Sequence, residues 1–105
     1  MRQWLLALVL LPLARPAAAQ GIDEWLAKAQ REQPRAVFLF LERRLNCAHL
    51  AGEEATNAER AAFLRFAVEN LRCATLPTDE AKLRRRHASQ RNVIAALNEA
   101  RDRQW

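Results

Sequence analysis

Apolar side chains recur every three or four residues over most of the chain after residue 20, which is the spacing of amphipathic helices. Only two glycines occur, and alanine, leucine, arginine and glutamate fill most positions between the apolar ones. This composition favours helix and disfavours strand. The pattern therefore predicts an all-α fold, a small single domain of four or five helices.

The first two helices are delimited by a proline and a glycine. A short helix is predicted around Ile22, Trp25, Leu26 and Ala29, and Pro34 ends it because the residue before a proline is pushed out of the helical region. A second helix is predicted over about 35–51, and Gly52 then acts as its stop. Its predicted apolar stripe is Val37, Phe38, Leu41, Leu45 and Ala48, with Ala36, Phe40 and Cys47 as a flank.

The third helix begins with a capping-box pattern. Thr56 and Glu59 have the spacing at which the two residues bond each other's backbone N–H groups. The helix should continue to Cys73, and its wide apolar arc predicts the most central helix of the domain. Pro77 and the acidic residues after it predict the start of another helix. A polar interruption over 89–92 should separate it from a last helix over about 93–104.

The beginning of the chain has the order of a secretory signal peptide. Arg2 is followed by an apolar run over 4–14, and Ala17 and Ala19 supply the small residues that signal peptidase requires. As a helix this run would span roughly 16 Å, about half of a bilayer's hydrocarbon core, so a cleaved leader is favoured over a membrane anchor. We predict a leader over 1–19, a mature domain over 20–105 with no membrane span, and a periplasmic or secreted location.

Export changes how the charges and the cysteines are interpreted. The mature part carries 15 basic and 12 acidic side chains, so its net charge is +3. Cys47 and Cys73 both lie in it, and an even count in a small exported domain predicts one disulfide. Closing a loop of this length should stabilise the fold by about 3–4 kcal/mol. On the predicted map, the bridge would require the third helix to cross the second.

The most unusual local composition lies over 47–54, where a thiol, an imidazole, a turn glycine and two carboxylates are grouped. One interpretation is metal binding: His49 and Glu53 could share an ion if the helix continued past Gly52. A fuller zinc set would add both cysteines and His87, but it needs reduced thiols in an oxidising compartment.

A second interpretation is catalysis with His49 as the base, but no nucleophile accompanies it, since the only serine of the mature part is Ser89. The third is structural, with His49 bonding a helix end or the loop while Glu53 and Glu54 line the approach to the next helix. The same charged loop is also a reasonable partner-binding surface. We predict a candidate binding loop of His49, Gly52, Glu53 and Glu54, with no catalytic residue, metal or cofactor.

Three consecutive arginines occupy 84–86. Consecutive residues on a helix point about 100° apart, so they cannot form one basic face. Glu80 lies four residues before Arg84 and can pair with it. The pattern does not favour nucleic-acid binding, which needs a broader basic stripe with exposed aromatics. Contact with an anionic envelope polymer stays open.

The spacing Cys47-x-His49-x-x-Gly52-Glu53, followed by Cys73, resembles a group of small exported proteobacterial proteins of uncharacterised function. The resemblance covers roughly 45–97 and implies export and paired cysteines, but no activity. Leu50 stands where that group usually has an aromatic residue, and Ala55 and Thr56 replace its usual proline and aromatic. A looser similarity, in class alone, is to small disulfide-bonded secreted inhibitors of lysozyme.

Together these patterns predict a non-enzymatic, exported binding or envelope-associated protein. Its partner would be an envelope protein or an anionic envelope polymer. The alternative is an inhibitor or chaperone-like partner of a cell-envelope enzyme such as a lysozyme.

Overall fold

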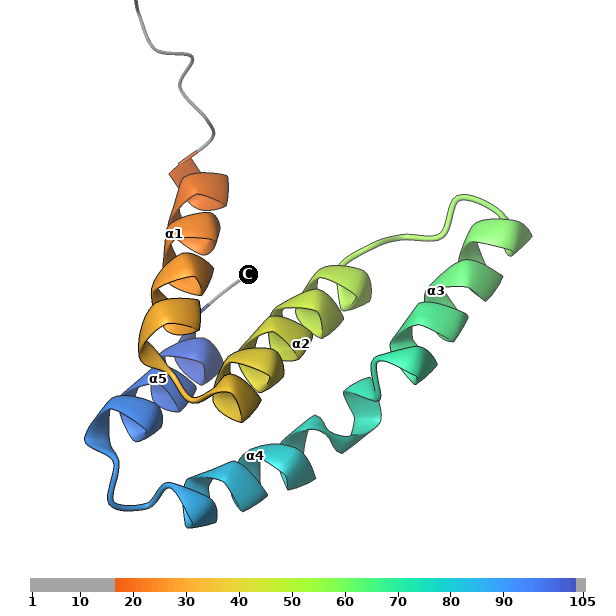
Figure 1. Ribbon diagram of the computed structural model, residues 1–105. Helices are drawn as coiled ribbons and strands as arrows, with labels where there is room; N and C mark the ends of the chain where they lie inside the picture. The colour runs from red at the N-terminus through yellow and green to blue at the C-terminus, as the bar shows by residue number, and fades with distance from the viewer. Residues whose placement is uncertain (1–16, 104–105) are drawn as a thin grey trace, which may run out of the picture.

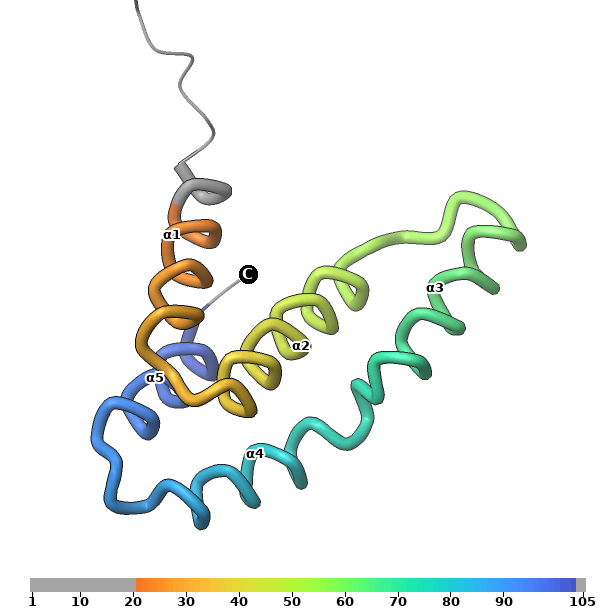
Figure 2. Tube along the Cα trace, in the orientation of Figure 1, coloured from red at the N-terminus to blue at the C-terminus, as the bar shows by residue number. Residues whose placement is uncertain are grey.

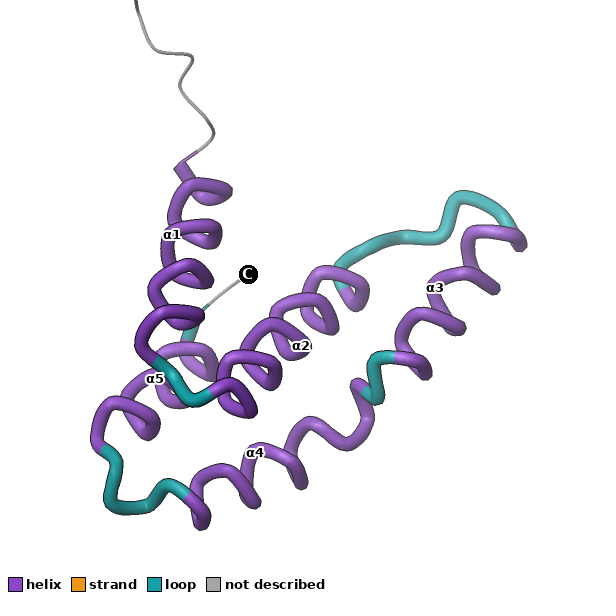
Figure 3. The backbone as a smooth tube through the Cα atoms, viewed as in Figure 1, coloured by secondary structure: helices purple, strands orange, loops and turns teal. Residues whose placement is uncertain are grey.

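The computed structural model describes residues 17–103, with side chains from residue 21 onward, and this part of the chain is helical (Figure 1). The elements are α1 (Ala17–Glu32), α2 (Arg35–Ala51), α3 (Ala58–Asn70), the short 3-10 helix η1 (Cys73–Thr75), α4 (Leu76–Arg86) and α5 (Arg91–Asp102). Figure 3 shows helices and loops and no strand within these residues. The predicted all-α fold of four or five helices is confirmed, with five α-helices in the described residues.

The predicted leader lies largely outside the described residues, since these begin at residue 17 (Figure 2). Its predicted cleavage point after Ala19 falls within the bounds of α1. Trp25 and Ala29, which pack in the hydrophobic core, both follow that point. Within the described residues, no helix combines the length and the apolar character that crossing a membrane requires.

The centre of the fold is α2, which contacts α1, α3, α4, α5 and η1. Its buried apolar residues recur every three or four positions, so they form one stripe along the helix that faces the other helices. The main buried cluster consists of Ala29 from α1, Val37, Phe40 and Leu41 from α2, and Val93, Leu97 and Ala100 from α5. The predicted flank residues Phe40 and Cys47 are buried, whereas Ala36 is exposed.

The prediction that the third helix is the most central one is wrong. Of its side chains only Leu64 is buried, while Phe63 and Phe66 are 53% and 66% exposed. Its apolar residues are spread around the helix rather than gathered on one side, so burying one face leaves the others in solvent. A wide apolar arc was therefore a misleading sign of centrality.

The start of α3 also differs from the predicted capping box. The N-cap residue is Asn57, whose Oδ1 accepts a hydrogen bond from the backbone N–H of Arg60 at 2.8 Å. Asn is among the best N-cap residues because its short side chain reaches the first free N–H groups. The helix consequently begins one residue later than Thr56 would place it.

The third helix ends before Cys73, contrary to the prediction. Arg72 adopts a left-handed conformation with φ 54° and ψ 47°, which interrupts the helix and starts η1. A residue with a Cβ atom adopts this conformation at some cost. The turn is stabilised by the backbone N–H of Thr75, which donates to the carbonyl oxygen of Arg72 at 3.2 Å, and the Thr75 Oγ1 lies 3.1 Å from the same oxygen.

The last two helices follow the prediction closely. Pro77 lies in the first turn of α4, and the break before α5 covers 87–90, two residues earlier than expected. The predicted pair of Glu80 and Arg84 is present at 3.1 Å. Arg44 of α2 also binds Glu80, at 3.1 Å, and no local pattern in the sequence indicates this second contact.

A neighbouring ion pair repeats this link between α2 and α4. Arg43 binds Asp79, and Thr75 donates a second hydrogen bond to the same carboxylate at 2.9 Å. The hydrogen bond from Arg43 lowers the pKa of Asp79 below its ordinary value, and the bond from Thr75 lowers it further by a smaller amount. Arg43 and Arg44 of α2 thus form ion pairs with the consecutive carboxylates Asp79 and Glu80 of α4.

Candidate functional site

The predicted disulfide is present. Cys47 of α2 and Cys73 of η1 are bonded, with their Cα atoms 5.6 Å apart. The predicted crossing of the helices does not occur: Figure 1 shows α3 running back in roughly the opposite direction to α2 after a loop that leads away from it. The bridge needs no crossing because Cys73 lies beyond the end of α3, in the turn that brings the chain back beside α2.

We call residues 52–70, the loop and α3, the arm. Arg60 connects its two parts. The Arg60 guanidinium binds Glu53 of the loop at 2.7 Å and lies over the ring of Phe63, 4.9 Å from its centroid. Its backbone N–H is the one that Asn57 caps. The loop is thereby ordered against the first turns of α3, and one face of Phe63 is covered.

The predicted loop residues do not converge on a common point. His49 is exposed on the last turns of α2, and Glu54 is exposed in the loop, whereas Glu53 is half-buried through its bond to Arg60. Gly52 ends α2 as predicted, with its N–H donating to the carbonyl oxygens of Ala48 and His49. Its φ of −83° is open to any residue, so the backbone does not require glycine here.

This geometry bears on the metal and catalytic interpretations of the loop. The helix stops before Glu53, and both thiols are in the disulfide, so neither proposed ligand set is assembled. Over residues 17–103 there is no group of three or more metal-ligating side chains. In that range no carboxylate is hydrogen-bonded to the His49 ring, while His87 pairs instead with Gln90 at 2.8 Å.

The sequence interpretation missed the most unusual feature of the arm, which is its exposed aromatic surface. Phe63 and Phe66 are the two most exposed large apolar side chains of the described residues. They lie three residues apart on α3, and residues at this spacing are neighbours on a helix surface. The signal was available: α3 has apolar residues on all sides, which one packing partner cannot cover.

Two carboxylates flank this aromatic pair along α3, Glu59 four residues before Phe63 and Glu69 three residues after Phe66. Glu59 and Glu69 are exposed on α3, and Glu54 is exposed in the adjoining loop. The arm carries four carboxylates and two guanidiniums, whereas the rest of the predicted mature domain carries 13 basic and 8 acidic side chains. The arm is therefore an acidic, aromatic projection of a basic protein.

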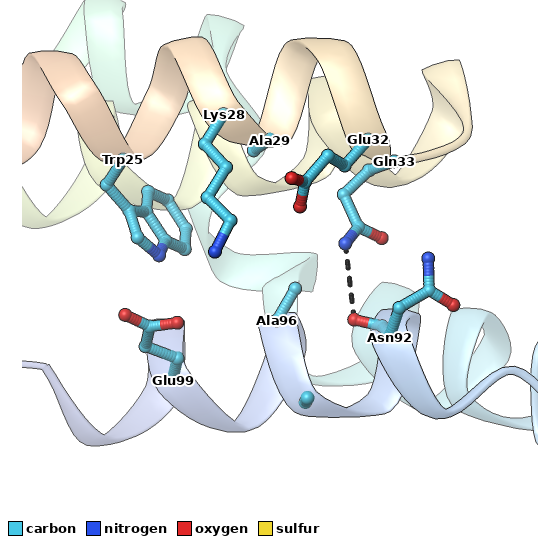
Figure 4. Close-up of a pocket in the computed structure, with 9 residues that line it drawn as sticks. Trp25, Lys28, Ala29, Glu32, Gln33, Asn92, Ala96 and Glu99 are labelled. Atoms are coloured by element: carbon cyan, nitrogen blue, oxygen red, sulfur yellow. Dashed lines mark hydrogen bonds between the residues drawn. The ribbon is translucent and has the colours of Figure 1, made fainter.

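A cleft of about 200 Å³ lies elsewhere, between α1 and α5 (Figure 4). Trp25 and Lys28 extend from α1 toward α5, and Glu99 extends back toward Trp25. Gln33 closes one end by donating to the carbonyl oxygen of Asn92 at 3.2 Å. The cleft is small, and its charged residues have both signs, so it does not select a ligand class.

Comparison of the chain with protein-family models, curated proteins and solved structures gave no match.

Proposed function

We propose that this is a non-enzymatic, exported binding protein that contacts a protein partner through its arm. The observation that carries the proposal is the exposure of Phe63 and Phe66 on one helix. Adjacent exposed aromatic residues are costly in water and typical of interfaces, where a few aromatic side chains supply most of the binding energy. The contact surface thus includes α3 as well as the 49–54 loop.

The partner we propose has an apolar recess rimmed by basic side chains. The recess would take the phenyl rings, and the basic rim would face Glu59 and Glu69, which are exposed near them on α3, and Glu54, which is exposed in the preceding loop. Charge complementarity of this kind steers association and selects the partner. The rest of the molecule is basic and repels a basic partner. Such a partner is therefore directed to the acidic arm.

A second copy of the chain fits the arm less well. The exposed part of the two rings amounts to roughly 200–250 Å², given about 200 Å² for a whole aromatic side chain. A stable interface buries about 800 Å² per partner. In a dimer formed through α3, two surfaces of the same charge would also face each other. The two phenyl rings are therefore better suited to insertion into a recess of a different protein than to a dimer interface.

Export is supported by the disulfide, since such bonds persist in oxidising compartments. The narrower form of the proposal is an inhibitor or chaperone-like partner of a cell-envelope enzyme such as a lysozyme. One observation favours it: the loop and the start of α3 extend beyond the C-terminal end of α2 (Figure 1), so this part of the arm can reach into an active-site cleft.

The test begins with capture of a partner from periplasmic extract on the oxidised protein, followed by binding measurements with that partner purified. Substituting both rings, Phe63→Ala with Phe66→Ala, should weaken binding by about a hundredfold or more, as for paired hot-spot residues. The matched control is Leu39→Ala, which removes an apolar side chain 44% exposed on α2, outside the arm. It should leave the affinity unchanged.

Charge is tested separately with Glu59→Gln and Glu69→Gln, which should slow association and reduce its dependence on salt. For the inhibitor form, the captured enzyme should lose activity when the protein is added. Equal effects of the arm and Leu39 variants would contradict the proposal. So would a dimer in solution that the double phenylalanine variant abolishes.

A further inference from the structure

A second cleft opens onto the disulfide. It has a volume of about 390 Å³, and both cysteines line it together with residues of α2, α4 and α5 and Arg103. Cys47 is buried, with 5% of its surface exposed, whereas Cys73 is half-buried. Small-molecule sites typically have volumes of roughly 300–1,000 Å³, so a small thiol has room to enter. The cleft therefore makes the bridge accessible from outside, although one of its cysteines is buried.

A nucleophile can reach the two cysteines to different extents. A thiolate attacks one sulfur of a disulfide and expels the other, and access decides which sulfur is attacked. The more exposed residue here is Cys73, which makes Cys47 the leaving group. Among the described residues, the charged side chains that line the cleft are arginines, each paired with a carboxylate outside it. The lining itself contains no carboxylate that would repel an approaching thiolate.

The bridge is placed where it can control the arm. It joins η1, just after the arm, to the last turns of α2, just before it, so the arm lies within a covalently closed loop. In α3 only Leu64 is buried, and an isolated helix of 13 residues is marginal in water. Opening the bridge therefore allows the arm to lose its order. The next helix, α4, stays attached to α2 through the Arg43–Asp79 and Arg44–Glu80 ion pairs.

We propose that this cleft is the entry site for thiol–disulfide exchange at Cys73, through which a dithiol switches the arm from an ordered to a disordered form. In the first step a thiolate of the dithiol bonds to the Cys73 sulfur, the bridge breaks, and Cys47 leaves as a thiolate. In the second step the other thiolate of the dithiol attacks its own partner sulfur and releases Cys73. The dithiol is thereby oxidised to a disulfide, and the two protons that it loses are taken up by the two cysteines.

The switch rests on the proposed function, because its effect is on the partner's access to an ordered Phe63 and Phe66 pair. A partner that binds the reduced protein must also order α3. If the ordered form makes up about a tenth of the reduced molecules, the affinity falls about tenfold. The exchange at Cys73 does not involve the rings, so the exchange and the partner binding can be tested separately.

The first experiment follows reduction of the oxidised protein by dithiothreitol. The rate should rise linearly with thiol concentration, because direct attack through the cleft does not wait for unfolding. Ala51→Trp adds bulk at an exposed residue that lines the cleft, and it should slow reduction by about tenfold or more, since exchange depends on access. The control Ala36→Trp adds the same side chain at an exposed position of α2 outside the cleft and should change the rate less than about twofold.

The attacked sulfur is identified on the unmodified sequence. After brief treatment with 2-mercaptoethanol, acid quenching and alkylation, peptide mass mapping should find the mixed disulfide on Cys73 and the alkylated thiol on Cys47. The reverse assignment would overturn the entry site. So would a rate that reaches a plateau as the thiol concentration rises, or equal slowing by the two tryptophan substitutions.

The switch is tested by hydrogen exchange and by partner binding. In the reduced protein the α3 amides should lose protection, and the partner captured on the oxidised protein should bind about tenfold or more weakly until reoxidation restores the affinity. An α3 that stays as protected as α2 after reduction, or equal affinities of the two forms, would overturn the switch. Undiminished binding by the Phe63→Ala, Phe66→Ala variant would instead refute the proposed function.

Discussion

Replacing both cysteines with alanine tests how the arm is held in place. Cys47→Ala with Cys73→Ala removes a cross-link between residues 26 apart in sequence. A bridge closing a loop of this length stabilises a protein by about 3.5 kcal/mol if its effect is confined to the unfolded chain. That figure assumes that the native state stays ordered when the bond is absent.

The structure argues against that assumption. The arm has one buried side chain, Leu64, whose burial contributes roughly 1.5–3 kcal/mol. Ordering each of its residues costs about 1–2 kcal/mol, and an isolated helix of 13 residues is marginal in water. The main buried cluster, drawn from α1, α2 and α5, includes no residue of the arm. We therefore expect the arm to detach while the core stays folded, so that the global free energy of unfolding falls by less than about 3.5 kcal/mol.

Native-state hydrogen exchange measures this directly. In the double variant the amides of α3 should exchange with little protection, while those of α2 and α5 keep the protection that matches global unfolding. The reduced wild-type protein is the control, because it keeps the sulfur atoms and leaves no cavity at Cys47. If the α3 amides of either protein exchange with the same free energy as those of α2, packing holds the arm and the reasoning is refuted.

Three further expectations concern single side chains. Asp79→Asn should make the free energy of unfolding fall less steeply as the pH is lowered. The bond from Arg43 lowers the pKa of Asp79 in the folded protein. The ionised carboxylate therefore stabilises the fold fully above the pKa of an unfolded aspartate, about 4, and this stabilisation is lost as the pH falls through the lower pKa of the folded state. Urea unfolding at a series of acidic pH values measures it, and parallel profiles for the two proteins would contradict it. Leu41→Ala should lower the free energy of unfolding by about 2–5 kcal/mol, because Leu41 is fully buried, and a loss below about 1 kcal/mol in urea titration would remove it from the core. Asn57→Ala should cost about 1 kcal/mol as a lost helix cap, while Thr56→Ala leaves stability unchanged; the opposite ranking in thermal unfolding would reinstate the capping box.

Local signals in the sequence predicted most of the fold. The bounds of α2 follow from Pro34 and Gly52, because the restriction before a proline and the stop at a glycine act within a few residues. Pairing of Cys47 with Cys73 required only their number and the inference of export. The Glu80–Arg84 pair was equally local, since both residues lie on one helix.

What the sequence did not predict depends on which surfaces meet in three dimensions. The spread of apolar residues around α3 indicates that one packing partner cannot cover them all, but it does not show which of them stay exposed, so Phe63 and Phe66 could not be singled out from it. The left-handed Arg72 carries no composition signal, because a glycine or asparagine is the usual residue there. The match between Arg43 and Asp79 joins residues 36 apart and exists only once α2 and α4 are packed.

The arm has a consequence for how this protein can change over evolution. Because a covalent tether and one buried leucine attach α3, its outward positions are nearly free of folding constraints. Substitutions there alter the exposed surface while the hydrophobic core keeps its sequence. Descendants of one such protein could diverge in partner through these positions alone, and a library randomised over them should yield folded variants at high frequency.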